Sequence, residues 1–159
     1  MITREQLKTQ LTYNSLTGEF IFNKKKGGMP KGSVAGYAQR DGYIVISING
    51  KQYKAHRLAW LYVHGAFPDY QIDHINMKRG DNRMANLREA TKSQNHMNRT
   101  AYSNNKLGVK GVHMVGRKFR ALIKKNGNQV CLGVYDSLDD ASDAYKKASQ
   151  AMHGSFSRA

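Results

Sequence analysis

The stretch that decides the fold runs from residue 71 to residue 99 and reads QIDHINMKRGDNRMANLREATKSQNHMNR. Its opening residues 71–74 predict a short strand that carries an Asp-His pair directly behind an apolar residue. Residues 87–90 predict a returning strand, and Thr91 is the expected N-cap of a helix that begins near Lys92. The stretch therefore predicts a strand–loop–strand–helix unit.

This unit carries a carboxylate, an imidazole and two carboxamides at defined spacing. Eleven residues separate His74 from Asn86, and eight more separate Asn86 from Asn95. Oxygens of Asp73 and the Asn side chains form a hard donor set that suits Mg²⁺, Mn²⁺ or Ca²⁺ and not Zn²⁺. A neutral histidine beside such a metal is what a general base for water needs. An Asp-His pair alone is common, and Asn often fills turns and caps helices, so the ordered set of four carries the prediction.

These residues resemble the HNH endonuclease family, the ββα-metal nucleases, over roughly residues 10–99. The resemblance implies that Asp73 and Asn95 hold one divalent metal ion, Mg²⁺ or Mn²⁺. It also implies that His74 activates water and that Asn86 braces the loop. Many members carry a Cys-x-x-Cys zinc pair where this chain has Thr91 and Gln94, so no structural zinc is expected.

Two other histidines fit the catalytic role less well. His64 ends a preceding predicted helix, where a surface role is expected. His96 is adjacent to Asn95 and would point about 100° away from it on a helix.

The segment before the Asp-His strand predicts a hairpin followed by a helix. Residues 43–48 and 51–56 predict two strands joined by Asn49-Gly50, a preferred two-residue hairpin turn, and residues 57–64 predict a helix. The pattern Y-x-x-H-R-L-A-W resembles the phage and intron-associated branch of the HNH family. His56 and Arg57 are candidate contacts to a substrate phosphate. The Lys- and Gly-rich residues 23–36 predict a mobile loop.

The C-terminal third predicts a second, smaller unit. Residues 100–107 lack periodicity and predict a linker. Three short strands follow at 111–114, 117–124 and 129–135, and Ser137 is the expected N-cap of an amphipathic helix. The overall expectation is an α+β protein: a nuclease domain at 1–99 with its ββα-metal core at about 68–99, then a sheet-plus-helix domain at 108–156.

The C-terminal pattern F-x-A-x-I, L-G-x-Y and A-x-x-A-Y-x-x-A resembles the AP2 DNA-binding domain. In that family a three-stranded sheet enters the major groove, which implies DNA contacts from one face of this sheet. The candidate DNA-binding residues are Lys110, His113, Lys118, Arg120, Lys124 and Gln129. Leu122 shares the outward face and either touches a thymine methyl group or is covered by the linker. The competing interpretation is a packing module that does not contact DNA.

Charge gives the strongest global prediction. The net charge is +15, from 26 Lys and Arg against 11 Asp and Glu, which predicts an anionic partner, most simply double-stranded DNA. Residues 90–135 contain nine Lys or Arg and no Asp or Glu. The single cysteine, Cys131, fits a reducing compartment, and no apolar run suggests a membrane span. We therefore expect a cytoplasmic protein, in a bacterial host cell if phage-encoded, without a membrane or an obligate protein partner.

Together these features predict a metal-dependent DNA endonuclease with a C-terminal targeting domain, of the phage homing type. Two alternatives stay open from the sequence. One is a DNA-binding regulator on an inactive HNH scaffold, and the other is a non-specific toxin or defence nuclease.

Overall fold

The computed structural model describes residues 1–99, 105–125 and 127–157. It divides the chain into two compact units, Met1–Lys92 and Ser93–Ala159, each with its own hydrophobic core. The predicted linker at 100–107 falls partly outside the described residues, at 100–104. No helix in the described ranges is both long and apolar enough to span a membrane.

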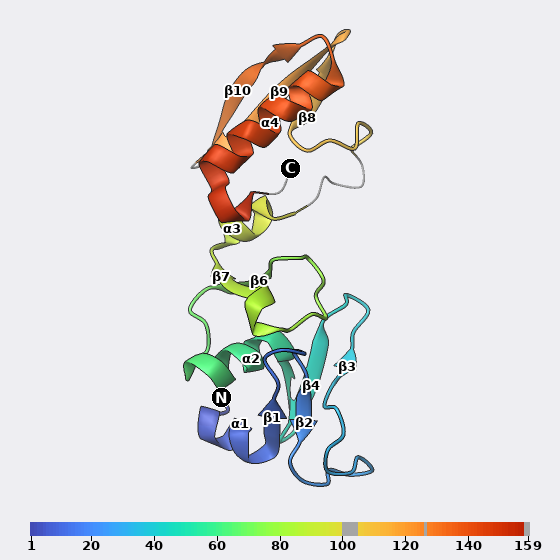
Figure 1. Cartoon of the computed structure of the whole chain (residues 1–159), viewed down its shortest axis with the longest axis vertical. Coiled ribbons are helices and arrows are strands. Elements are labelled where there is room, and N and C mark those ends of the chain that lie inside the picture. The colour runs from blue at the N-terminus through green and yellow to red at the C-terminus, as the bar shows by residue number, and fades with distance from the viewer. Residues whose placement is uncertain (100–104, 126, 158–159) are drawn as a thin grey trace. The chain divides into compact units, whose positions relative to one another are not determined.

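The first unit contains three small antiparallel sheets and two helices (Figure 1). Its elements are α1 (Arg4–Gln10), β1 (Leu11–Tyr13), β2 (Phe20–Phe22), β3 (Tyr37–Ala38), β4 (Ile44–Ile48), β5 (Lys51–Lys54), α2 (Ala55–His64), β6 (Gln71–His74), the 3₁₀ turn η1 (Met84–Asn86) and β7 (Leu87–Ala90). The sheets pair β1 with β2, β3 with β4 with β5, and β6 with β7. Apolar residues from the helices, β1, β2, β4, β6 and β7 share one core.

Local sequence signals account for several of these elements. Thr3 and Gln6 form a reciprocal capping box at the start of α1. Asn49 and Gly50 both have positive φ, 50° and 74°, as the predicted two-residue turn between β4 and β5 requires. Gly65 ends α2 in the left-handed conformation. The predicted hairpin and the predicted helix are both confirmed, although α2 begins at Ala55, two residues early, so His56 is helical.

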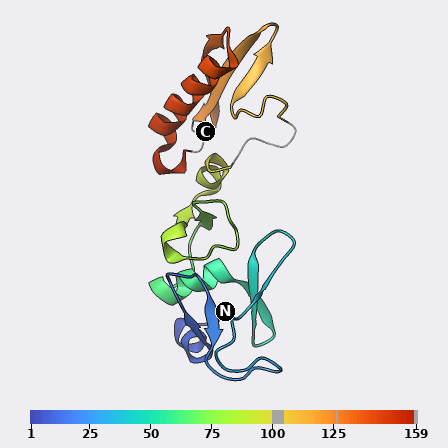
Figure 2. The ribbon, with the colours of Figure 1, turned by 45° about the vertical axis from the view of Figure 1, so that its right-hand side comes forward.

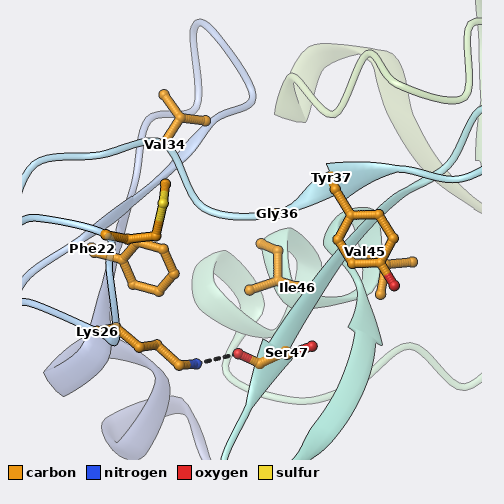
Figure 3. Close-up of a pocket in the computed structure, with 9 residues that line it drawn as sticks. Phe22, Lys26, Val34, Gly36, Tyr37, Val45, Ile46 and Ser47 are labelled. Atoms are coloured by element: carbon orange, nitrogen blue, oxygen red, sulfur yellow. Dashed lines mark hydrogen bonds between the residues drawn. The ribbon is translucent and has the colours of Figure 1, made fainter.

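The loop at residues 23–36, which the sequence predicts to be mobile, is attached to the rest of the unit by backbone bridges. Ile21 forms an antiparallel bridge with Val34, and Lys26 forms one with Met29. Beside β4 the loop borders an open pocket of about 280 Å³, and the Lys26 ammonium donates to the backbone carbonyl of Ser47 in its wall (Figure 3). The same ammonium lies 5.5 Å from the centroid of the Phe22 ring, so two contacts hold the end of this side chain.

The second unit is a three-stranded sheet covered on one face by a long helix (Figures 1 and 2). Its elements are α3 (Lys92–Met97, which begins at the last residue of the first unit), β8 (Val112–Val115), β9 (Lys118–Lys125), β10 (Asn128–Tyr135), α4 (Leu138–His153) and η2 (Gly154–Phe156). The Ser137 side chain accepts a hydrogen bond from the Asp140 amide, as predicted for the N-cap of α4. The predicted α+β composition, including a C-terminal three-stranded sheet and helix, is confirmed.

Candidate active site

The β6–β7 hairpin carries the Asp-His pair, and the predicted strands at 71–74 and 87–90 are confirmed. In its register Asp73 pairs with Arg88, and His74 pairs with Leu87. Asp73 and His74 are each only 4% exposed. Because successive side chains of a strand point to opposite faces, Asp73 and His74 have different neighbours.

Asp73 is held by a cation from the paired strand. Arg88 donates from Nε to Oδ2 of Asp73 at 2.9 Å, and its Nη2 lies 2.7 Å from the same oxygen. Both side chains are largely buried, with 16% of Arg88 and 5% of Asp73 exposed. The guanidinium offsets the cost of burying the carboxylate, so the ion pair holds the Asp73 oxygens in place at the end of the sheet.

His74 is oriented by Asn82. The imidazole Nε2 lies 3.3 Å from Oδ1 of Asn82, while Nδ2 of Asn82 donates to the Gly80 carbonyl, which fixes the orientation of the carboxamide. An oxygen acceptor opposite Nε2 selects the tautomer with its proton on Nε2 and the lone pair on Nδ1. Burial lowers the pKa of His74, so the ring is neutral at physiological pH, as a general base must be.

Asn82 is itself supported by the N-terminal hairpin. The Tyr13 hydroxyl donates to the Asn82 carbonyl at 2.6 Å, and burial raises the pKa of Tyr13 to about 12, so the phenol keeps its proton. The turn between β1 and β2 packs on the same backbone: the Met84 amide donates to the Ser15 carbonyl. Gly18 lies so close that an added Cβ would be 2.5 Å from the Arg83 nitrogen. Residues remote in sequence therefore position the partner of His74.

Asn86 ties together the loop between β6 and β7. Its Nδ2 donates to Oδ1 of Asn76 at 3.0 Å and to the Asp81 carbonyl at 2.8 Å, and its Oδ1 accepts from the Asn76 amide at 3.0 Å. Its backbone carbonyl also accepts from the Ile75 amide. Asn86 is 7% exposed, so this side chain is an internal link of the loop.

Asp81 stabilises the same loop from its outer side. Arg83 contacts both carboxylate oxygens of Asp81, at 2.8 and 2.6 Å, and Asn76 donates to Oδ2 at 2.6 Å. The hydrogen bond from Arg83 holds the pKa of Asp81 below its usual range. The loop that contains Asn82 is therefore closed at several points.

His56 lies beside His74 inside the unit. The two rings are 5.1 Å apart and nearly perpendicular, at 82°. His56 is 5% exposed, and its Nδ1 has no hydrogen-bond partner among the described residues. Burial lowers the pKa of His56 to about 3, so it stays neutral. A contact from His56 or Arg57 to a substrate phosphate stays a prediction.

Two cations surround Tyr43, which contacts both histidines. The Tyr43 ring is 5.9 Å from the His74 ring and 5.1 Å from the His56 ring. Lys54 Nζ lies 3.8 Å from the Tyr43 centroid, and the Arg79 guanidinium carbon lies 5.1 Å from it. Asp41 lies 4.0 Å from Lys54 Nζ and offsets part of this charge. The two cations therefore leave a net positive charge on this side of the site, which favours binding of a phosphodiester.

Asn95 lies on α3 in the second unit, and its pairing with Asp73 at a metal stays a prediction. Lys110 also has contacts within the second unit: its ammonium donates to the Met97 carbonyl at 2.5 Å and to the Arg99 carbonyl at 2.9 Å. These bonds satisfy backbone groups at the end of α3. A DNA contact by Lys110 remains to be tested.

The other candidate DNA contacts lie on the sheet. Arg120 of β9 pairs with His113 of β8, and Lys124 pairs with Gln129 of β10. Directly paired residues project on the same side of an antiparallel sheet. The register therefore gathers these four side chains, with Lys118, on a single face.

Sequence reasoning missed Asn82, Arg88 and Tyr43. Asn82 lies in a polar loop where Asn is common, and Arg88 is one of 26 Lys and Arg residues. Arg88 could have been found by aligning the two predicted strands as an antiparallel hairpin, because that register places it opposite Asp73. Tyr43 had no local signal that connected it to His74.

Residues 53–97 match the family model described as HNH endonuclease. They include β6, the loop braced by Asn86, β7 and α3, so the match covers all four residues of the predicted site. The match begins within β5, so it also includes the helix that carries His56.

Two individual proteins are similar to the chain. One is a mimivirus protein from Acanthamoeba polyphaga mimivirus named "Uncharacterized HNH endonuclease L560", which is 30% identical over 122 residues. The aligned region covers 76% of this chain and 63% of that protein, so the chain spans less than two thirds of its relative. The other is the solved structure of the HNH homing endonuclease I-HmuI, described as binding and cleaving DNA. Its TM-score is 0.45 at 20% identity, covering 91% of this chain and 85% of that chain. That TM-score is too low to establish a common fold.

Proposed function

We propose that this chain is a divalent-metal-dependent DNA endonuclease in which His74 is the general base. The observation that carries the proposal is the environment of His74 within the HNH segment. The ring is neutral, its Nε2 faces Asn82 at 3.3 Å, and it is adjacent to a carboxylate held by Arg88. In this tautomer Nδ1 accepts the proton of the attacking water.

The donor chemistry fits one hard cation. Within the described ranges, no group of three or more His, Cys, Asp or Glu side chains is arranged to hold a metal. A single carboxylate with a carboxamide oxygen still suits Mg²⁺, which keeps several waters and takes one or two carboxylates. Asp73 and Asn95 would hold Mg²⁺ or Mn²⁺. The bound ion would stabilise charge on the scissile phosphate and the leaving oxygen.

The charge of the chain supports double-stranded DNA as the substrate. The cations around Tyr43 lie beside His74, and the C-terminal sheet presents further Lys and Arg residues. We propose an AP2-like reading role for that sheet, which makes the enzyme site-selective and of the phage homing type, acting in the host cytoplasm. A regulator with an inactive HNH scaffold is the alternative that shares the same DNA-binding surface.

The test is cleavage of plasmid DNA with and without Mg²⁺, by wild type and His74→Ala. We expect metal-dependent cutting by wild type and a loss of about 10²–10⁴-fold in rate for the variant, the usual contribution of a positioned general base. DNA affinity should be largely unchanged, because neutralisation of phosphates by Lys and Arg side chains, and not the neutral His74 ring, drives most of it. Full cutting by His74→Ala, or by wild type in excess chelator, would reject the mechanism. DNA binding without any cutting would favour the regulator.

A further inference from the structure

The face of the C-terminal sheet opposite α4 carries a strip of apolar side chains between basic ones. Leu122 of β9 pairs directly with Cys131 of β10, and Arg120 pairs with Val134. Since paired residues project on the same side, Leu122, Cys131 and Val134 form what we name the apolar strip. The covered face holds the buried Ala121 and the buried Ile123 instead.

A bulge in β10 creates this strip. Cys131 pairs with Leu122, but Gly133 pairs with the next residue of β9, Ala121, so Leu132 is an extra residue. Without the bulge, residue 133 would follow Cys131 on the outer face. With it, Val134 turns outward, while Leu132 and Tyr135 pack against the core. Gly133 allows the bend with its φ of 141°.

The strip is open to solvent in its own unit. Val134 is 49% exposed, Cys131 is exposed, and Leu122 is half-buried. An ordinary solvated sheet face would carry polar residues at these positions. The exposed apolar groups therefore suggest a partner that presents apolar groups to this face.

Charge complementarity identifies the partner as DNA. Arg120 and Lys124 lie on either side of Leu122 along β9, on the same face, and Gln129 pairs with Lys124. No acidic residue occurs from residue 90 to residue 135. A protein partner with a matching apolar patch would not explain the flanking cations. The major groove does, because it offers thymine C5-methyl groups within a phosphate-lined channel wide enough for a β-ribbon.

We propose that this face reads thymine methyl groups in the major groove, with Leu122, Cys131 and Val134 as the methyl contacts and Arg120 and Lys124 beside them. The inference rests on the proposed function, because it takes DNA as the substrate. It adds that the target contains thymines whose methyl groups contribute to recognition.

The probe is one plasmid fragment of fixed sequence, amplified once with dTTP and once with dUTP, so that only the C5-methyl group differs. Binding of full-length protein is measured by competition without divalent metal, which separates binding from cleavage. The proposal predicts weaker binding to the uracil DNA, by about fourfold for each methyl contacted. It further predicts that the double variant Leu122→Thr, Val134→Thr loses this preference.

A matched control is available on the same strand. Val130 pairs with Ile123 on the α4 side and is 36% exposed, so Val130→Thr makes the same change on the other face and should keep the preference. Thermal unfolding checks that each variant is folded, and Val134→Thr alone, expected to show a partial loss, replaces the double variant if that unfolds. Equal affinity of wild type for the two DNAs, or an undiminished preference in folded variants, overturns the inference. Absence of any DNA binding would instead reject the proposed function.

Discussion

At the scale of single residues, the candidate site depends on side chains that hold other side chains. Arg88 forms an ion pair with Asp73, and Asn82 orients His74. Asn86 closes the loop between β6 and β7. None of these partners has a reactive group of its own. Their contribution is to fix position, tautomer and charge, so their replacement should change stability and metal response in distinguishable ways.

Replacing Arg88 should expose the electrostatic role of its ion pair. Arg88→Met leaves the Asp73 carboxylate buried without its guanidinium, and removing one member of a buried pair costs about 3–5 kcal/mol. We expect a lower Tm, and a larger increase in Tm on adding Mg²⁺ than wild type shows, because the cation substitutes for the lost positive charge. The control is the double variant Asp73→Asn, Arg88→Met, which should not respond to Mg²⁺. The same Mg²⁺ response in all three proteins would argue against a metal at Asp73.

Asn86 and Asn95 should differ when each is changed to alanine. Asn86 makes three hydrogen bonds across its loop, so Asn86→Ala should lower cleavage and Tm without shifting the Mg²⁺ midpoint. Asn95→Ala should shift that midpoint to higher Mg²⁺ or abolish activity at any concentration, because we propose it as a ligand. Mg²⁺ titrations of the cleavage rate compare the two. Superimposable curves for both variants would remove the distinction between brace and ligand.

At the scale of elements, the N-terminal hairpin is part of the support of the site. The turn between β1 and β2 lies on residues 82 and 83 through Gly18, and Tyr13 bonds the Asn82 carbonyl. The β6–β7 hairpin alone has only two short strands, and isolated two-stranded hairpins are marginally stable. The preceding elements therefore supply the packing that keeps the loop between β6 and β7 in place.

Gly18→Ala tests this support. Gly18 has a φ of 79°, and an added Cβ would meet the backbone of Asn82 and Arg83 at 2.5 Å, so the turn must move off the loop. We expect a lower Tm together with a lower cleavage rate. Gly27→Ala is the matched control, because Gly27 also has positive φ, 56°, but nothing lies within 4 Å of its added Cβ. If the two variants lose equal stability and activity, backbone strain alone explains the effect and the contact with the loop is unimportant.

At the scale of the whole molecule, the two units have separate cores and, by our proposal, separate tasks. The first carries Asp73, His74 and Asn86, and the second carries the basic sheet face. The boundary between units falls at the start of α3, between Lys92 and Ser93. A truncated protein that is meant to retain Asn95 must therefore include α3 together with the first unit.

A protein ending at Arg99 should fold and cut DNA with less selectivity. It loses the basic sheet, and each phosphate contact contributes a slope of about −0.9 to the dependence of log affinity on log salt concentration. We expect weaker binding with a shallower salt dependence, and cleavage at more sites on the same plasmid. Binding at two salt concentrations and mapping of the cut ends measure both effects. An unchanged site with an unchanged salt slope would make the second unit a packing module.

The sequence by itself determined the elements whose signals are local. These are the Asn-Gly turn between β4 and β5, the alternation in β9, the caps of α1 and α4, and the Asp-His strand with its returning partner. Each follows from residues close in the chain. The spacing of Asp73, His74, Asn86 and Asn95 likewise identified the candidate site, because residue types and their separations can be read from the sequence alone.

Only the tertiary structure decided which residues surround that site. Tyr13 reaches Asn82 across 69 positions of the chain, and Tyr43 and His56 come to His74 from other elements. The bulge that turns Val134 outward also could not be predicted from the sequence, because a simple two-residue alternation along β10 would place Val134 on the opposite face. The physical reason is common to all of these: local patterns report the period of one element, whereas packing between elements sets the neighbours of a side chain.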